Sequence, residues 1–446
     1  MLTAAHALSV QLDGEPRIVW PASAMTTGGE LPASRRTPSG GREFVVIPGV
    51  GSLPRSRRHS RALAHWMRTP GERDAHSFEG PDLTRRGRPA RSLSGRTRRI
   101  RASVRARCRD ATVAGMDLSI FFAGTAGSVP SARRGLPALL LQRGGDRILF
   151  DCGEGTQRQL LRSIGLADLE AVFVTHFHAD HWLGLPGMLK SFALRERSEP
   201  LDVYGPRGLG ELMSVMRIVY GRLPYALNIV EVEPAQTVRR DGYGIAAIPV
   251  RHSREGCLGY AVVEDARPGE FDVRAAEALG VRPGPDFGLL QRGEQVGAVR
   301  PEQVMGPARP GRKIVFSGDS APCEALAVAA HGADVLVHEA TFAEEEAGRA
   351  RETSHSTARQ AAELAREADV RLLALTHFSS RYAGGELRDE ARAVFAATEA
   401  PRDFDTIEIP LPERGGPQLL RWADRQARER PPETERERPA EAVAPT

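Results

Sequence analysis

The chain has 446 residues, of which 41% are hydrophobic and 26% charged, with 4 cysteines and a formal net charge of +4. This length allows two or three domains, and the composition excludes a collagen-like, coiled-coil or wholly disordered protein. No apolar run reaches the ~18 residues of a membrane span, and the start lacks the basic and apolar stretches of a secretory signal. The scattered cysteines, none in a CxxC pair, indicate a protein of the reducing cytoplasm.

The first 115 residues differ from the rest in charge. They hold 21 arginines, no lysine and 9 acidic residues, a net charge of +12, whereas residues 116–446 carry −8. Arg, Ser, Pro and Gly cluster here without a sustained period of 2 or 3.6, a composition that rarely folds. Three interpretations remain open: a disordered basic arm that aids RNA capture, a targeting segment, or mis-annotated sequence upstream of a start at Met116. We favour the last, or a dispensable leader.

From residue 116 the pattern becomes regular. Strands are expected over 118–123, 138–142, 147–150, 169–174, 201–204, 228–232, 245–250, 313–316, 335–337, 371–375 and 404–409. Helices are expected over 157–163, 187–195, 208–220, 323–331 and 357–367. This alternation predicts an α/β layered fold for residues 116–422. The charged, proline-rich residues 423–446 are expected to be a disordered tail.

Residues 264–310 interrupt this domain. Six prolines and many glycines mark an inserted excursion rather than core. Only one short helical stretch is expected in it, over residues 273–279, followed by a proline-stiffened loop over 280–286.

The strongest chemical signal is a cluster of ligand-type side chains after the expected strand 169–174. His176, His178, Asp180 and His181 fall within six residues. Burying them together is costly unless something pairs with them, and imidazole with carboxylate ligation is typical of zinc. The cluster therefore predicts one half of a metal centre.

Isolated ligand-type residues recur where other expected strands end, namely His252, Asp319 and His377. Together with the cluster they fit two metal ions. One ion takes His176, His178 and His252, the other takes Asp180, His181 and His377, and Asp319 bridges. Two zinc ions per subunit, with manganese as an alternative, would acidify a shared water and clamp a phosphodiester. Asp151 is expected either to accept the N–H of a ligating histidine or to be a helix N-terminal carboxylate.

Longer motifs at residues 150–157, 338–342, 355–357 and 375–382, with Pro283, Gly284 and Pro285 in the insertion, carry a resemblance. Over residues 116–411 the chain resembles the metallo-β-lactamase superfamily and, within it, the ribonuclease Z family. The resemblance implies an α/β fold, an αββα sandwich with an inserted flexible arm at 264–310. It implies a short-form, homodimeric endonuclease that removes the 3′ trailer from precursor tRNA. Its products are a tRNA 3′-hydroxyl and a 5′-phosphorylated trailer.

The resemblance also implies roles for single residues. Asp180 orients or deprotonates the attacking water as well as binding metal. His355, held by Glu339, protonates the leaving 3′ oxygen, and a carboxylate that fixes and raises the basicity of its histidine suits that role. The arm grips the tRNA away from the metals, through the residues Arg282, Pro283, Gly284 and Pro285.

Two other functions compete with this one. The first is another hydrolase of the superfamily, a phosphodiesterase, arylsulfatase or thioester hydrolase that acts on small molecules, which the metal ligands alone do not exclude. The second is a non-catalytic RNA-binding module, whose signature would be the loss of a ligand. No ligand is missing from the sequence.

Overall fold

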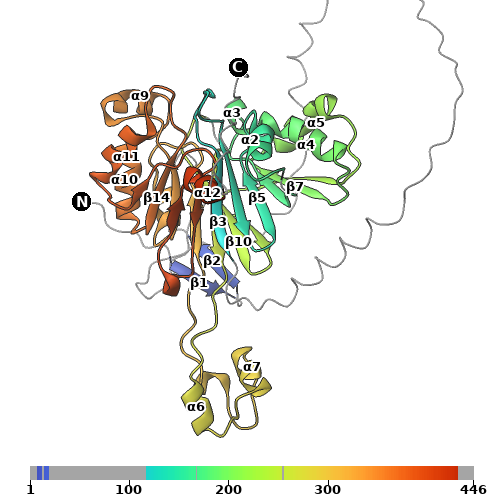
Figure 1. Cartoon of the computed structure of the whole chain (residues 1–446), viewed down its shortest axis with the longest axis vertical. Coiled ribbons are helices and arrows are strands. Elements are labelled where there is room, and N and C mark those ends of the chain that lie inside the picture. The colour runs from blue at the N-terminus through green and yellow to red at the C-terminus, as the bar shows by residue number, and fades with distance from the viewer. Residues whose placement is uncertain (1–7, 13–14, 20–116, 167, 254–255, 430–446) are drawn as a thin grey trace, which may run out of the picture. The chain divides into compact units, whose positions relative to one another are not determined.

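The computed structural model describes residues 8–12, 15–19, 117–166, 168–253 and 256–429 (Figure 1). Within the arginine-rich leader the described part is two strands, β1 (Leu8–Leu12) and β2 (Glu15–Val19), which pair antiparallel and which the sequence analysis did not expect. The rest of the predicted leader, residues 1–115, lies outside the described residues. So do residues 430–446 of the predicted disordered tail.

The first large sheet has eight strands in the order β17-β16-β3-β4-β5-β6-β7-β8. Its strands are β3 (Leu118–Gly124), β4 (Ala138–Arg143), β5 (Asp146–Phe150), β6 (Ala171–Phe173), β7 (Leu201–Gly205), β8 (Leu227–Glu231), β16 (Thr406–Glu408) and β17 (Gln418–Leu420). β4 and β5 form the predicted antiparallel hairpin, whereas β5 to β8 run parallel. Parallel neighbours need crossover connections, and α2 (Thr156–Arg162), α4 (Gly184–Leu194) and α5 (Leu209–Tyr220) supply them.

The second sheet has seven strands in the order β15-β14-β13-β12-β11-β10-β9. Its strands are β9 (Thr237–Arg240), β10 (Tyr243–Pro249), β11 (Leu258–Glu264), β12 (Lys313–Phe316), β13 (Val335–Glu339), β14 (Leu372–Thr376) and β15 (Thr398–Glu399). Helices α8 (Glu324–Ala330), α10 (Ala358–Glu367) and α11 (Gly384–Arg392) pack on it through a mostly alanine and leucine face. Small side chains let these helices lie close to the sheet.

The two sheets enclose the main core. Aromatic rings fill its centre, with the ring centroids of Phe150 and Phe316 only 4.2 Å apart and Tyr260 beside Phe173. A separate apolar cluster joins α2, α4 and α5 to the outer face of the eight-stranded sheet. The layers are therefore helix, sheet, sheet, helix, as Figure 1 shows, which confirms the predicted αββα sandwich.

Several elements were not predicted. A four-residue helical turn, α3 (Ala179–Trp182), holds Asp180 and His181, and α9 (Ala347–Glu352) is six residues long. α11 begins with two glycines and buries few apolar side chains, so its helical signal is weak. In the part of the chain that the structure describes, no helix is long and apolar enough to cross a membrane.

The insertion between β11 and β12 is more ordered than its prolines suggested. It contains α6 (Val273–Ala278), α7 (Pro285–Gln291) and the 3-10 turn η2 (Pro301–Gln303). The loop predicted over residues 280–286 is wrong at its end, because Pro285 is the first residue of α7, where a missing N–H costs nothing. A small core of its own holds the insertion together, built on Ala276, Val281, Leu290, Val299 and Val304. Because Glu264 still belongs to β11, we take residues 265–311 as the arm in place of the predicted 264–310. Its helices lie apart from both sheets in Figure 1.

Two charged contacts fix the base of the arm. The backbones of Arg267 and Arg309 bond to each other at 2.7 and 2.9 Å, and both side chains reach Glu413. Just inside, the buried Glu264 bonds to both Arg143 and Arg312 at 2.7–2.8 Å. These contacts hold together the two chain segments that connect the arm to the sandwich. We call this paired region the neck of the arm.

The disordered tail predicted from residue 423 is wrong at its start. Helix α12 (Trp422–Glu429) continues the ordered chain. Its first residue is held by a 2.9 Å bond from the Trp422 N–H to Asp405 and by an edge contact of its ring with Phe404. One aromatic anchor thus orders a highly charged segment that composition alone marks as disordered.

Candidate metal centre

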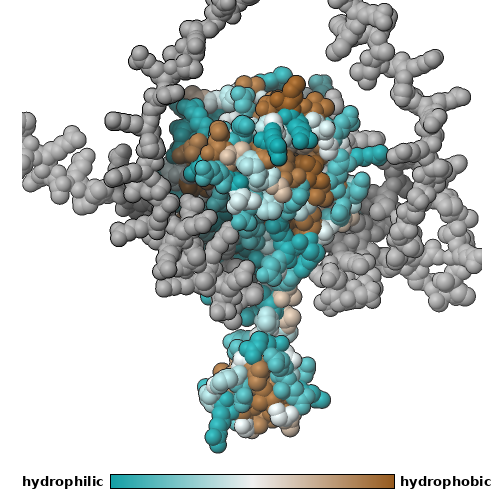
Figure 2. All heavy atoms as spheres, turned by 90° about the vertical axis from the view of Figure 1, so that its right-hand side faces the viewer, coloured by the Kyte–Doolittle hydropathy of each residue, from teal (hydrophilic) through white to brown (hydrophobic). Residues whose placement is uncertain are grey.

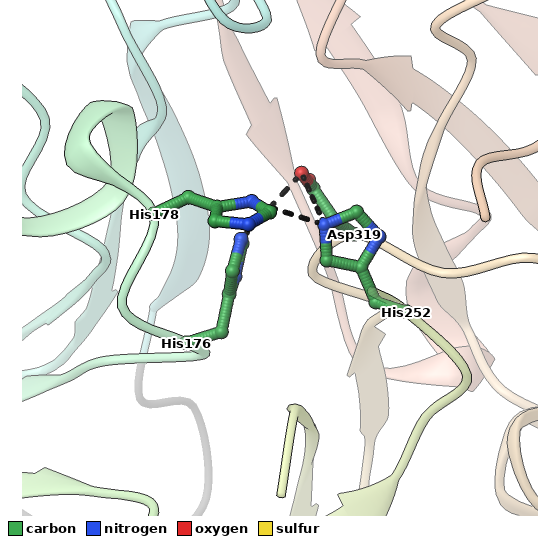
Figure 3. A group of neighbouring side chains, drawn as sticks. All are labelled: His176, His178, His252 and Asp319. Carbon is green, nitrogen blue, oxygen red and sulfur yellow. Dashed lines mark hydrogen bonds and ion pairs between the residues drawn. The ribbon is translucent and has the colours of Figure 1, made fainter. Parts of the chain in front are cut away.

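The candidate ligands gather where strands of both sheets end. His176 and His178 follow β6, His252 follows β10, Asp319 follows β12 and His377 follows β14. Figure 3 shows His176, His178 and His252 turned toward the carboxylate of Asp319. Ligand sites at strand ends are the usual place for function in layered α/β folds, because the loops there are set by rigid strands.

One group consists of His176, His178, His252 and Asp319. Their ligand atoms all lie within 4.8 Å of one another. The Nδ1 of His178 is 3.1 Å from Nε2 of His252, and Oδ2 of Asp319 lies 3.7 and 3.8 Å from Nε2 of His176 and His252. Three imidazoles and one carboxylate oxygen thus surround a single small space.

A second group consists of Asp180, His181 and His377, also within 4.8 Å. Oδ2 of Asp180 lies 3.5 and 3.4 Å from Nε2 of His181 and His377. The same Oδ2 of Asp319 lies 3.3 and 3.2 Å from these two nitrogens. Asp319 therefore stands between the two groups and touches both.

Hydrogen bonds at the far ring nitrogen orient the histidines. Nδ1 of His181 donates to Asp151 at 2.7 Å, and Nδ1 of His252 donates to the carbonyl of Ser354 at 2.9 Å. The Thr341 hydroxyl donates to Glu339, so it accepts from Nδ1 of His377 at 2.9 Å. Each bond occupies Nδ1 and turns Nε2 of the same ring toward the centre, the orientation that metal-binding histidines adopt.

Sequence reasoning missed three of these partners, Thr175, Thr341 and Ser354. Thr175 donates to Asp151 at 2.9 Å and lies 3.0 Å from Nδ1 of His176. Thr175 and Ser354 stand directly before His176 and His355, and Thr341 lies inside the motif at residues 338–342, which is the signal that could have found them. Asp151 itself bonds to Thr175 and His181 as an acceptor rather than at a helix start.

The chemistry of this donor set fits cations. The Nε2 atoms of four histidines lie 3.2–3.8 Å from one buried carboxylate oxygen, Oδ2 of Asp319. Nε2 of His176 and Oδ1 of Asp319 have no hydrogen-bond partner among the described residues. Burial lowers the pKa of both His176 and His178, which keeps their imidazoles neutral and able to ligate. Burial also disfavours charge on His181, yet Asp319 and Asp151 hold its pKa well above the ordinary value. The field at the centre thus favours positive charge, and the cluster is of the kind that holds divalent metal ions.

The backbone around the ligands is shaped for close approach. Asp151 and His377 have φ of 58° and 57°, the left-handed region that non-glycine residues rarely occupy. A Cβ at Gly127 would lie 2.5 Å from Nδ1 of His377, so only glycine fits there. Such strain gathers where a site needs side chains in fixed positions.

A further pair lies beside the ligands. Nδ1 of His355 is 2.8 Å from Oε1 of Glu339, which has no exposed surface and also accepts from the Ser320 N–H at 2.9 Å. Burial disfavours the imidazolium, but the Glu339 carboxylate outweighs burial and raises the pKa of His355 to about 9. His355 is thus a cationic proton donor at neutral pH, held 4.0 Å from Asp319.

Comparison with known proteins places the chain. Residues 146–270 and 296–378 match the family described as a Beta-lactamase superfamily domain. The ribonuclease Z of Methanosarcina mazei is 44% identical over 301 residues, which cover 66% of this chain and 98% of that protein. The ribonuclease Z of Myxococcus xanthus is 45% identical over 303 residues, with the same two coverages. The chain belongs to the ribonuclease Z family.

Membership confirms the family, the fold and the endoribonuclease activity predicted from the motifs. A crystal structure of human tRNase Z, short form, shares 26% identity and covers 66% of this chain and all of that one, with a TM-score of 0.49. The gap between the two matched segments of the superfamily domain, residues 271–295, falls inside the arm. The arm is therefore added to the superfamily core.

The arm residues predicted to contact substrate stand away from the metal centre. Arg282, Pro283, Gly284 and Pro285 lie between α6 and the start of α7, and none of them lines a cavity at the centre.

Two cavities flank the centre of this ribonuclease Z family member. One, of about 270 Å³, includes His355, Thr341 and Phe342 in its wall. The other, of about 150 Å³, lies against His176, His178 and Arg207. An extended substrate that crosses the two ligand groups would thus find a cavity on each side of them.

Proposed function

We propose that the protein is a metal-dependent endoribonuclease that removes the 3′ trailer from precursor tRNA, leaving a tRNA 3′-hydroxyl and a trailer with a 5′-phosphate. The observation that carries this is the Glu339–His355 pair beside the two ligand groups, in a chain that belongs to the ribonuclease Z family. A hydrolase that cleaves a phosphodiester needs an acid for the leaving oxygen, and this pair supplies one.

The ligand groups support two ions per chain. His176, His178 and His252 would hold one, Asp180, His181 and His377 the other, and Asp319 would be shared. Mostly imidazole ligation favours zinc, with manganese as the alternative. Bound there, the ions would supply positive charge to the phosphate and lower the pKa of a water molecule.

The chain's own residues then divide the remaining work. Asp180, fixed by the Ser128 N–H at 2.8 Å, orients or deprotonates the attacking water. Its pKa lies below the ordinary value because bonds and charges from His377 and His181 outweigh burial, so the carboxylate is ionised. His355 gives a proton to the leaving 3′ oxygen, and Glu339 keeps that imidazole charged and in place.

The arm supports a substrate larger than a nucleotide. Its paired neck and its own small core make it a firm extension, and Arg282 with Pro283, Gly284 and Pro285 is proposed to contact the tRNA body. A pre-ordered extension loses less entropy on binding than a mobile loop. Specificity for tRNA would then come from the arm, and cleavage from the metal centre.

We also propose a homodimer in the cytoplasm. Large apolar side chains stand exposed on α4 and α5, namely Leu194, Val215, Ile218 and Val219. Figure 2, which views this side of the sandwich, shows hydrophobic surface among the hydrophilic, and such patches commonly mark contacts between copies.

The test compares two substrates. Purified protein loaded with zinc is assayed on a precursor tRNA and on bis(p-nitrophenyl) phosphate, and the RNA ends are mapped. We expect a single cut after the tRNA, with a 3′-hydroxyl on one side and a 5′-phosphate on the other. Hydrolysis of the small ester without cleavage of the precursor would overturn the proposal in favour of a small-molecule phosphodiesterase.

A further inference from the structure

The larger cavity, beside His355, is lined by residues other than the proposed metal ligands. Its wall includes Ser128, Phe342, Arg349, His355, Ser379 and Arg381. At about 270 Å³ it is near the lower end of ligand pockets, which hold ~300–1,000 Å³, so it suits one nucleotide rather than a helix. None of the seven proposed metal ligands lines it.

The two arginines form a cationic rim. Nη1 of Arg381 lies 2.9 Å from Oε2 of Glu346, and Nη1 of Arg349 lies 3.9 Å from Oε1 of the same carboxylate. The Tyr382 hydroxyl donates to that carboxylate as well. Because one carboxylate faces two guanidinium groups, the rim keeps a net positive charge. The contacts with Glu346 also hold both arginine side chains in position.

Both guanidinium groups remain available. The side chains of Arg349 and Arg381 are 53% and 41% exposed. The Arg381 guanidinium also lies 5.9 Å from the centroid of the Phe342 ring, which limits its motion. Fixed, exposed arginines beside hydroxyl groups such as those of Ser379 and Ser380 are typical of a phosphate site.

The proposed cleavage reaction determines which nucleotide lies in this cavity. In the proposed cleavage, water oxygen bonds to phosphorus, the P–O3′ bond breaks, and its electron pair stays on O3′. The proton for that oxygen comes from His355, whose Nδ1 is occupied by Glu339 and whose Nε2 remains to donate. The nucleotide that owns the leaving O3′ must therefore stand on the His355 side, where the cavity opens.

We propose that this cavity binds the last nucleotide of the tRNA, with Arg349 and Arg381 on the phosphate at its 5′ side. This rests on the proposed function, and it adds the direction in which the RNA crosses the centre. The trailer then lies on the side of His178, away from the arginine rim.

The test is a double-mutant cycle between protein and RNA. The double variant Arg349→Ala, Arg381→Ala is compared with wild type on three precursors: unmodified, with a neutral methylphosphonate on the 5′ side of the last tRNA nucleotide, and with the same change one position into the trailer. Arg388→Ala, on α11 and paired with its neighbour Asp389, is the matched control. Turnover of bis(p-nitrophenyl) phosphate checks that each variant is folded.

We expect the tRNA-side methylphosphonate to lower kcat/KM of wild type and of the control about 10- to 100-fold, the range for a charge-assisted hydrogen bond. In the double variant the same modification should cost less than about threefold, since the partner is gone. The trailer-side modification should cost equally in all three proteins. Coupling on the trailer side, or none at either position, would overturn the inference while leaving the proposed function standing. A wild-type enzyme that does not cut the unmodified precursor would instead reject the proposed function.

If the double variant loses turnover of the small ester, the single variants Arg349→Ala and Arg381→Ala are used in its place. Each should show a partial loss of coupling to the same tRNA-side phosphate. Single variants that fold and show no such loss would overturn the inference.

Discussion

His355 and Glu339 form an ion pair between a loop and the end of a strand, with 2.8 Å between Nδ1 and Oε1. Glu339 ends β13, and His355 lies just before α10, whose N-cap Thr357 closes a capping box with Gln360. The strand end and the capped helix therefore both limit how far the pair moves. A buried carboxylate that keeps one imidazole charged is costly for stability and is kept where a proton must be delivered.

The Glu339→Gln variant should move the basic limb of the pH profile. The carboxylate raises the pKa of His355 to about 9, so His355 is protonated below that pH and loses its proton as the pH rises through it. Without the charge the pKa falls, and cleavage should decline at lower pH than in wild type. The measurement is kcat/KM on precursor tRNA from about pH 6 to about pH 10, in which we expect the basic limb of the variant to lie at lower pH. Glu363→Gln, on the exposed face of α10, is the control, and an unshifted limb in Glu339→Gln would remove His355 as the acid.

The contacts at the neck of the arm should also contribute to the free energy of unfolding. Removing the carboxylate by Glu264→Ala leaves Arg143 and Arg312 buried without it, and breaking a buried pair costs about 3–5 kcal/mol of unfolding free energy. Arg239→Ala, whose partner Asp265 is exposed, should cost less than about 1 kcal/mol. Equal losses in denaturant unfolding of the two variants would contradict this.

The same carboxylate predicts a pH dependence of stability. Burial disfavours ionised Glu264, but Arg312 and Arg143 outweigh burial and hold its pKa below the ordinary value. A depressed folded pKa gives stability that is present above the unfolded pKa of about 4.3 and lost as the pH falls through the folded one. Wild type should therefore lose unfolding free energy on acidification more steeply than Glu264→Gln.

An arm-less variant should separate the two substrates. Because the Arg267 and Arg309 backbones already bond across the neck, a Gly-Gly turn in place of residues 268–308 closes it without strain. We expect precursor tRNA cleavage to fall about 100-fold or more in kcat/KM, while hydrolysis of bis(p-nitrophenyl) phosphate changes less than about threefold. Equal losses on both substrates would show that the arm supports the fold rather than the RNA.

The dimer is tested at its apolar face. Ile218, 90% exposed on α5, is changed to Glu, and the mass in solution is measured by light scattering. A charge placed in an apolar contact should turn a dimer into a monomer. Leu279→Glu, at an exposed apolar position of the arm, should leave the mass unchanged. A monomeric wild type would contradict the proposal outright.

The sandwich was predictable because its strands carry strong local signals. β3, β4, β5 and β12 each contain at least three consecutive apolar residues, and the glycines between β4 and β5 mark their turn. Elements that depend on a few distant contacts were missed. α12 is ordered by Trp422 on Phe404, and α7 by apolar side chains packed into the arm's own core, and neither contact is visible in composition.

The candidate ligands were predictable for a different reason. Histidine is rare in this chain, so a cluster such as His176 to His181 is conspicuous. Their partners were not. Thr341 is an ordinary residue until the fold places its hydroxyl between Glu339 and His377. The arginine rim was not predictable either: Arg381 lies in the motif at residues 375–382, but nothing in the sequence pairs it with Arg349, which shares the carboxylate of Glu346 with it in the fold.

The most direct test of the account is a metal titration of the apo-protein. Zinc is added stepwise, bound metal per chain is measured, and the rate of precursor tRNA cleavage is followed on the same samples. We predict that the rate rises until two ions are bound per chain, and that Asp319→Ala, which removes the shared carboxylate, binds fewer ions and is at least about 1,000-fold slower. Full activity of wild type with one ion or none, or of Asp319→Ala at any metal content, would contradict the account.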